Sequence, residues 1–384
     1  MKRVLLLPLA FCVLAAFALL PLPIPPYLDF QVIYHADLGL LRGISIYDHE
    51  GQVNMIAQMA NVPPERVFVL PFPYPPWYAL AALPLALLPI QIAARVWFEI
   101  NLLILILSIV LMTDGWPVHK RIWAGLAAIL FLPVLGSLVI GQYGFPILLG
   151  ASLYGYALKN RNAFLTAVAA VLLTFKPHLG IFILITGLIF LFLQRNDYGR
   201  RGLMAIIGAG LLLFAIGFLA SPLWPLDYYH SLTGFKDVSQ CHQCNSLPMV
   251  IAGSFGRGFA QAVWLAMGLL ILSAIWLSVE WKKLSIEPSL LVAGATIAIL
   301  LISPYLQNYD YILLLLPLFA LAYRADRLDW VWLTLAYLLP FAGFGFFGEA
   351  GNVSLVISSC ICFVLLARIA QQLDGSSNAA YNPK

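Results

Sequence analysis

Three charged side chains stand beside apolar segments of this chain: Asp29, Lys176 and Asp310. A charge in such a place costs about 3 kcal/mol, so it is kept where it forms a pair, anchors the chain or carries out chemistry. A carboxylate held at an interface can act as a general base toward a hydroxyl group. An ammonium group in a low-dielectric site can bind a phosphate. These residue types allow such chemistry, and a plain structural role stays open for each of them.

Asp29 precedes a helical pattern. Apolar residues recur at helical spacing up to Gly43, which provides a stop: Phe30, Ile33, Tyr34, Leu38 and Leu41. The spacing predicts an amphipathic helix lying on the outer membrane surface. Asp29 would stand at its N-cap, where a carboxylate accepts backbone N–H bonds. Two interpretations stay open, a simple cap and a general base.

Lys176 interrupts two apolar runs, where it either reaches toward the interface or binds a phosphate. Arg257 and Arg95 could add positive charge or act as plain anchors. The Asn308-Tyr309-Asp310 sequence places a carboxylate at the mouth of a turn, as a cap for the next helix or as a functional group.

Metal and cofactor motifs are weak in this sequence. Cys241 and Cys244 favour a short disulfide loop over a zinc site with His230 or His242, because a second ligand pair at standard spacing is missing. The Asp48-His49-Glu50 triplet is best interpreted as a solvated loop. Phosphate-binding glycine loops and a serine elbow are absent from the sequence. We therefore expect neither a metal site nor a cofactor.

The composition identifies a membrane protein. Of 384 residues, 62% are hydrophobic and 10% are charged, whereas soluble domains have about 25% charged residues. The net charge of +4 is accounted for by loop lysines and arginines, so no nucleic-acid partner is expected. Apolar runs of this total length correspond to about 12 membrane crossings. The predicted fold class is all-α, a polytopic membrane protein that contacts membrane lipids.

Charges predict the topology. Fifteen of the 21 basic residues, among them Arg121, Lys159, Arg324 and Arg368, can be placed on one side of the membrane. This excess of positive charge marks the cytoplasmic side, where we also place both chain termini. The outer face then receives the 25–76 loop, with a second helix near 50–60, and the 221–258 loop. A short dipping segment at 77–90 is expected before one span at 92–112. We predict a single domain over 1–370, a cytoplasmic tail at 371–384 and a location in the plasma membrane. Besides the first run at 4–22, the later apolar runs lie at 92–112, 122–140, 143–158, 162–175, 178–194, 202–220, 259–279, 287–303, 310–323, 329–346 and 353–369.

Several short motifs, in this order, resemble glycosyltransferase family 87 of the GT-C superfamily, the polyprenyl-phosphate-mannose-dependent mannosyltransferases. They are Asp29 with Tyr34, Ala36, Gly43 and Tyr47; Phe72-Pro73-Tyr74-Pro75-Pro76; Pro84 to Pro89; Gly141-Gln142; Lys176-Pro177; and Ser303-Pro304 with Asn308-Tyr309-Asp310. One departure concerns the last motif. Many family members have an aromatic residue and a histidine after the Ser-Pro pair, where this chain has Gln307 and Tyr309.

The resemblance implies an activity. A sugar, mannose in the family, would pass with inversion from a polyprenyl-phosphate donor to a lipid-linked or glycan acceptor at the outer face. Asp29 would be the general base and Lys176 the phosphate ligand. The remaining expected substrate-binding residues are Tyr34, Gln142, His178, Asn308, Asp310 and Arg257.

A lipid or sugar transporter is the competing interpretation. It predicts internal repeats and ionisable residues near the middle of the bilayer. The sequence shows no such repeat, and its unusual polar residues gather at the outer ends of the predicted spans.

Overall fold

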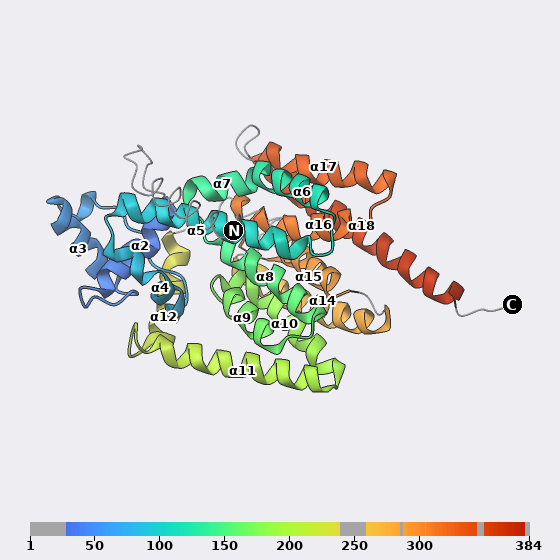
Figure 1. Ribbon diagram of the computed structural model, residues 1–384. Coiled ribbons are helices and arrows are strands. Elements are labelled where there is room, and N and C mark those ends of the chain that lie inside the picture. The colour runs from blue at the N-terminus through green and yellow to red at the C-terminus, as the bar shows by residue number, and fades with distance from the viewer. Residues whose placement is uncertain (1–27, 239–258, 285–286, 304, 344–348, 381–384) are drawn as a thin grey trace, which may run out of the picture. The chain divides into compact units, whose positions relative to one another are not determined.

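The computed structural model describes residues 28–238, 259–284, 287–303, 305–343 and 349–380 (Figure 1). These residues form α-helices and short 3-10 helices (η), and no β-strand occurs among them. The chain folds as two compact units. Unit 1 comprises Met1–Ile104, Leu138–Tyr143 and Leu213–Gln240, and unit 2 comprises Leu105–Ser137, Gly144–Leu212 and Cys241–Lys384. The all-α prediction is confirmed for the described part of the chain.

Unit 1 is built from the helices α2 (Leu28–Leu40), α3 (His49–Ala60), η1 (Pro64–Arg66), α4 (Pro76–Ala82), η2 (Leu83–Leu87) and α12 (Trp224–Val238). Three helices contribute residues to both units: α5 (Ile90–Met112), α7 (Leu132–Ile140) and α11 (Asp197–Gly217).

Unit 2 contains α6 (Val118–Leu130), α8 (Gly144–Lys159), α9 (Ala163–Leu173), α10 (Pro177–Gln194), α14 (Phe259–Leu284), α15 (Pro288–Ile302), η3 (Asn308–Leu314), α16 (Leu315–Ala322), α17 (Arg327–Gly343) and α18 (Glu349–Ala380). All eleven apolar runs predicted from 92 to 369 coincide with helices. The last helix, α18, continues to Ala380 and so includes most of the predicted tail segment from 371.

Local signals explain where many helices begin and end. Gly43 follows α2 with φ +76°, a left-handed conformation that other residues adopt at a cost of about 1 kcal/mol. Asp48 caps α3, its carboxylate accepting the Gly51 N–H at 2.9 Å. Pro177 is the first residue of α10, where the missing N–H is not needed. The predicted 50–60 helix is confirmed as α3, and the predicted dipping segment at 77–90 corresponds to the short helices α4 and η2 before α5.

Among the described residues, fewer helices could span a membrane than the sequence predicts for the whole chain. Four described helical segments are long and apolar enough to cross a membrane: Ile90–Met112, Pro177–Gln194, Asp197–Gly217 and Val353–Gln372. The pair α6 and α7, bent by 57°, would make a fifth. The predicted 12 spans are therefore not confirmed, although the apolar helices do indicate a membrane protein.

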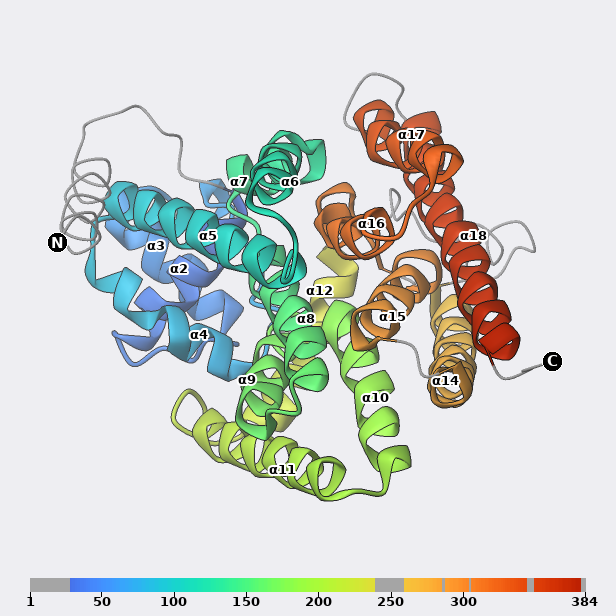
Figure 2. The same ribbon diagram turned by 45° about the vertical axis from the view of Figure 1, so that its right-hand side comes forward.

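Unit 2 also contains short apolar helices that are buried among other helices, such as α15. The helix α15 has 15 residues, about 22 Å at 1.5 Å per residue, which is less than a bilayer core of about 30 Å. It packs against α8, α10, α14, α16 and α18, and Figure 2 shows it among these helices. By contrast, α11 exposes large apolar side chains such as Leu211 and Leu212, as expected for contact with lipid tails.

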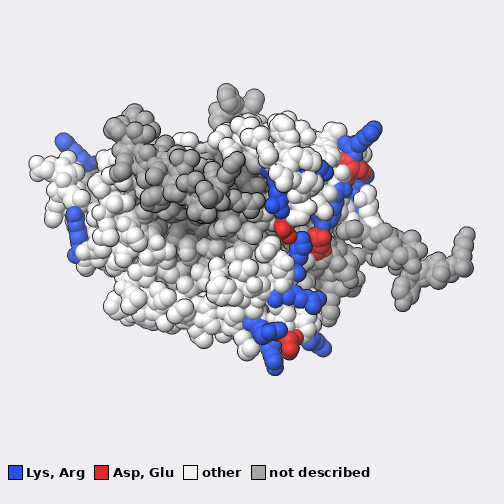
Figure 3. All heavy atoms as spheres, in the orientation of Figure 1, with Lys and Arg blue, Asp and Glu red and all other residues white. Residues whose placement is uncertain are grey.

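Ion pairs mark one end of the unit 2 helices. They are Asp114 with Lys159 and Arg121, Glu287 with Arg324, and Arg368 with Asp326 and Asp329. In Figure 3, blue and red side chains gather together in this part of unit 2. The basic members of these pairs are among those that the sequence placed on the cytoplasmic side. These contacts join the turn after α5 to the end of α8, and the start of α15 to the chain just after α16.

Candidate active site

The helix α2 of unit 1 holds Asp29, and it is buried rather than laid on a surface. None of residues 29–40 is exposed, and Phe30, Ile33 and Ala36 are fully buried against neighbouring elements. The helix packs on α3, α4 and η2. The predicted position of this helix on a surface is therefore wrong, although Gln31, His35 and Leu38 on one face are only half-buried. Asp29 lies inside the first turn, one residue after the helix start at Leu28.

A turn from a distant part of the chain fixes Asp29. The side-chain amide of Gln142 donates a hydrogen bond from Nε2 to Asp29 Oδ2, and Gln142 is 2% exposed. The Ile33 N–H donates to the Tyr143 hydroxyl at 3.4 Å. Asp29 and Ile33 are four residues apart and share one face of α2. Gln142 and Tyr143 thus hold the same helix face at two successive turns.

Gly141 makes this turn possible. It follows α7 with φ +70°, and its carbonyl accepts the Trp97 Nε1–H at 3.0 Å. A glycine in this position ends a helix without the steric penalty of a Cβ atom. The sequence motif Gly141-Gln142 therefore has a structural reason, because the glycine turns the chain and the glutamine reaches α2.

Tyr34 connects α2 to the segment that precedes α5. Its hydroxyl donates to the Leu88 carbonyl oxygen at 2.8 Å, and the side chain is 8% exposed. Burial raises the pKa of Tyr34 above 10, so the phenol stays protonated and keeps donating at neutral pH.

Sequence inspection missed Asp37, a buried carboxyl group on the same face of α2. It is 1% exposed, and its Oδ1 atom has no hydrogen-bond partner. Burial raises the pKa of Asp37 from 3.8 to about 9, so the group is protonated at neutral pH. The position eight residues after Asp29, among apolar neighbours, was the signal that could have revealed it.

Asp37 is expected to make stability depend on pH. Because its pKa is higher in the folded state, the folded protein binds a proton that the unfolded chain lacks between pH 4 and 9. Stability should therefore fall as pH rises through this window, by up to about 1.4 kcal/mol per pH unit. Thermal unfolding of detergent-solubilised protein at pH 6.5, 7.5 and 8.5 should show a steeper decline for the wild type than for Asp37→Asn.

The titration of His35 sets the lowest pH at which that experiment reports on Asp37 alone. Burial lowers the pKa of His35 to about 4, so its stability effect lies between pH 4 and 6.5 and has the opposite sign. Above pH 6.5 it contributes little. Parallel unfolding curves for the wild type and Asp37→Asn would contradict the assignment of Asp37.

The second cluster lies in unit 2 around Lys176. The Lys176 Nζ atom is 2.5 Å from Asp310 Oδ1, and the two side chains are 2% and 0% exposed. Nζ also lies 4.9 Å from the centre of the Tyr309 ring. The other carboxylate oxygen of Asp310 accepts the Gln307 N–H at 3.0 Å, which caps η3. Asp310 therefore combines both roles considered from the sequence, a helix cap and a charged partner.

The chain turns tightly at Lys176. The helix α9 ends at Leu173 and α10 begins at Pro177, so Lys176 is the N-cap of α10. Gly180 allows this turn, since a Cβ atom there would collide with the Leu173 carbonyl oxygen. The absent side chain lets the end of α9 pack on the first turn of α10.

His178 belongs to the same cluster. Its ring packs edge-on against Tyr305 at 5.2 Å between centroids, and it lies within electrostatic range of Lys176 and Asp310. Its Nε2 atom is buried without a hydrogen-bond partner. Asn308 lies half-buried in the first turn of η3, next to Tyr309.

The structure thus gathers the predicted residues into two groups. Unit 1 brings Asp29 and Gln142 together with Tyr34 on the same helix, and unit 2 brings together Lys176, His178, Asn308 and Asp310. Arg257, Cys241 and Cys244 lie outside the described residues. Arg95 is buried on α5. The described residues contain no group of three or more side chains suited to a metal ion.

Residues 72–304 match the family model described as glycosyltransferase family 87, and this segment is more than half of the chain. The chain belongs to glycosyltransferase family 87. The family 87 match includes Gln142, Lys176 and His178, and it ends shortly before Asn308 and Asp310. Membership makes the chain a glycosyltransferase with a sugar donor and an acceptor. A comparison with curated proteins gives no significant match, and neither does a comparison with solved structures.

Proposed function

We propose that this family 87 protein is an inverting mannosyltransferase that acts at the outer face of the plasma membrane. Its donor would be a polyprenyl-phosphate mannose and its acceptor a hydroxyl group of a lipid-linked sugar or glycan. The observation that carries the proposal is the hydrogen bond from Gln142 to Asp29. A neutral amide orients the carboxylate without cancelling its charge, which suits a general base.

The reaction needs one base and no strong acid. The acceptor oxygen attacks the anomeric carbon, the bond from that carbon to the phosphate oxygen breaks, and the hydroxyl proton passes to Asp29. The polyprenyl phosphate leaves with the bonding electron pair. A glycosidase needs a second carboxyl group to protonate an alkoxide, whereas a phosphate leaving group is already a weak base.

Lys176 is proposed to bind the donor phosphate. An ammonium group 2% exposed acts in a low-dielectric site, where it stabilises growing charge more strongly than in water. Asp310 compensates the charge of this ammonium when no donor is bound, because an unpaired buried cation would be costly. His178 and Asn308 are proposed to contact the sugar or the acceptor.

Transfer assays in liposomes test this function. The purified protein should move radiolabelled mannose from a polyprenyl-phosphate donor to a lipid-linked acceptor, with inversion at the anomeric carbon. GDP-mannose, as a soluble donor, should give no product. Equal use of GDP-mannose, or retention of configuration, would contradict the proposed donor and mechanism.

Gln142 is expected to act as a positioning residue. Gln142→Ala should lower kcat about 100-fold with little change in the KM for the donor, because misplacing a catalytic group by about 1 Å has this cost. Gln142→Glu places a second carboxylate beside Asp29 and should raise the pKa of the base. The acidic limb of the pH–rate profile should then move to higher pH. An unmoved profile would mean that Gln142 only packs against α2.

A further inference from the structure

A second site lies at the ion-paired end of unit 2. It is a pocket of about 130 Å³ between the turn after α5, the C-terminal end of α8, the start of α15 and the end of α16. The helix α8 ends at Lys159 beside the pocket, and α9 then runs back along α8 from Ala163 to Leu173. Lys176 follows α9 and precedes α10, so it lies at the opposite end of these helices. This pocket is therefore separate from the cluster assigned to the donor phosphate.

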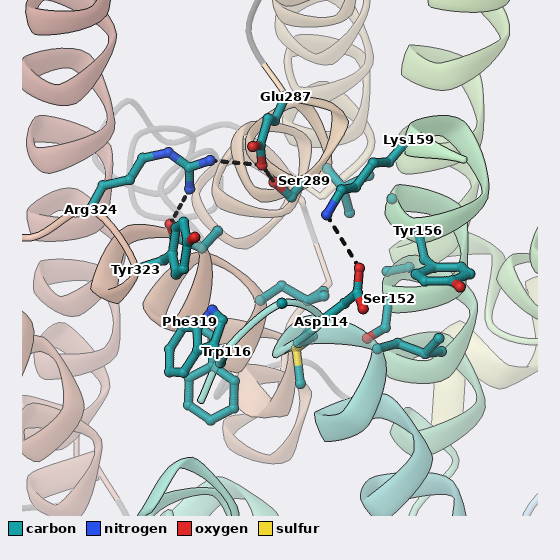
Figure 4. A pocket seen from close by; sticks show the side chains of 18 residues that line it. Asp114, Trp116, Ser152, Tyr156, Lys159, Glu287, Ser289, Phe319, Tyr323 and Arg324 are labelled. Atoms are coloured by element: carbon teal, nitrogen blue, oxygen red, sulfur yellow. Dashed lines mark hydrogen bonds and ion pairs between the residues drawn. The ribbon is translucent and has the colours of Figure 1, made fainter. Parts of the chain in front are cut away.

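Two ion pairs face each other across the pocket (Figure 4). Lys159 Nζ lies 3.2 Å from Asp114 Oδ2 on one side, and Arg324 lies 2.8 Å from Glu287 Oε2 on the other. These four are the charged residues that line the pocket, and their charges cancel; Arg121, 4.0 Å from Asp114, is not part of the lining. A bare anion or a bare cation would disturb this balance, whereas a ligand with one charge of each sign preserves it.

The pairs are also exposed enough to be exchanged. Side-chain exposure is 43% for both Lys159 and Asp114, 50% for Glu287 and 17% for Arg324. Exposed ion pairs of this kind contribute about 0–1 kcal/mol. A zwitterion can therefore replace each intramolecular partner at little cost.

Aromatic side chains complete the pocket. Trp116 stacks on Tyr323 with 5.9 Å between ring centroids, and the Arg324 guanidinium lies 5.4 Å from the Tyr323 ring. Aromatic faces attract ammonium groups, and tryptophan and tyrosine are common at the membrane–water interface. The floor is apolar, with Leu111, Val292 and Leu316 among its residues.

We propose that this pocket binds the phosphoethanolamine headgroup of a membrane lipid. The phosphate replaces the carboxylates as partner of Lys159 and Arg324, and the ammonium binds Asp114, Glu287 and the aromatic faces. The volume of 130 Å³ holds about nine water-sized atoms, close to the roughly eight heavy atoms of this headgroup. The apolar floor receives the glycerol end of the lipid.

The test measures lipid selectivity of the delipidated full-length protein. Phosphatidylethanolamine, phosphatidylcholine and phosphatidylglycerol are added separately in mixed micelles, and bound lipid is followed by native mass spectrometry and by the shift in Tm. Phosphatidylethanolamine should bind about tenfold more tightly than the others, since phosphatidylcholine cannot donate hydrogen bonds to carboxylates and phosphatidylglycerol has no cation. Equal retention of all three lipids would overturn the proposal.

Variants locate the selectivity in the pocket. Asp114→Asn and Glu287→Gln should each weaken phosphatidylethanolamine binding about tenfold. Asp197→Asn is the matched control, because Asp197 pairs with Arg200 on an exposed surface, with 82% of its side chain accessible. Unchanged binding in both pocket variants would contradict the site, and the wild-type selectivity decides the question if a variant does not fold.

Free phosphoethanolamine separates a lipid from a soluble ligand. At equal concentration it should stabilise the protein much less than the lipid, because it lacks the apolar end that the floor accepts. Stabilisation equal to that by phosphatidylethanolamine would overturn the assignment to a membrane lipid.

Discussion

Asp29→Asn should lower kcat for sugar transfer at least about 1,000-fold while leaving Tm nearly unchanged. Removing a general base costs about 10²–10⁴-fold in rate. Asparagine keeps the size of the side chain and one oxygen that can still accept the Gln142 amide proton. The variant therefore removes the basic carboxylate and preserves the packing of α2. The measurement is single-turnover transfer in liposomes with saturating donor.

Asp48→Asn is the matched control for this variant. Asp48 is also an aspartate of unit 1, but it caps α3 through the Gly51 N–H. Asparagine is an equally good cap, so both stability and transfer should stay near wild type. Full activity of Asp29→Asn would show that Asp29 only supports the start of its helix.

Lys176→Met should reduce both stability and donor use. Breaking a buried ion pair by removing one partner costs about 3–5 kcal/mol, because the other charge stays buried without compensation. Asp310 is fully buried, so this penalty applies to it directly. A loss of activity in this variant alone would not distinguish catalysis from folding.

The double variant Lys176→Met/Asp310→Asn makes that distinction. It removes both charges, and the side-chain oxygen of the introduced asparagine can still accept the Gln307 N–H that caps η3. Replacing a buried pair by neutral groups is often close to neutral for stability, so Tm should recover toward the wild-type value. If Lys176 binds the donor phosphate, transfer should stay at least about 100-fold below wild type. Recovery of activity together with Tm would show that the pair is only structural.

Helix positions were predictable from the sequence because they depend on short-range rules. Apolar runs, prolines and glycines indicated the eleven helical segments after residue 90 and the turns at Gly141 and Lys176. The basic loop residues predicted which helix ends lie together, and the ion pairs at Asp114 and Glu287 agree within unit 2. Length was harder to predict, since hydropathy does not distinguish a lipid-facing span from a short core helix such as α15.

Partners distant in the chain were decided by the tertiary structure alone. Gln142 binds Asp29 across 113 residues, and Lys176 binds Asp310 across 134 residues. Local patterns suggested these side chains one at a time, but which of them meet depends on how the helices pack. Burial of Asp37 has the same origin, because apolar neighbours in the sequence do not determine which face of the helix the core covers. The sequence by itself determined the helices, the membrane class and the residue types available for chemistry. Packing determined which charges are neutralised, which carboxyl group is protonated and which carboxylate an amide holds in place.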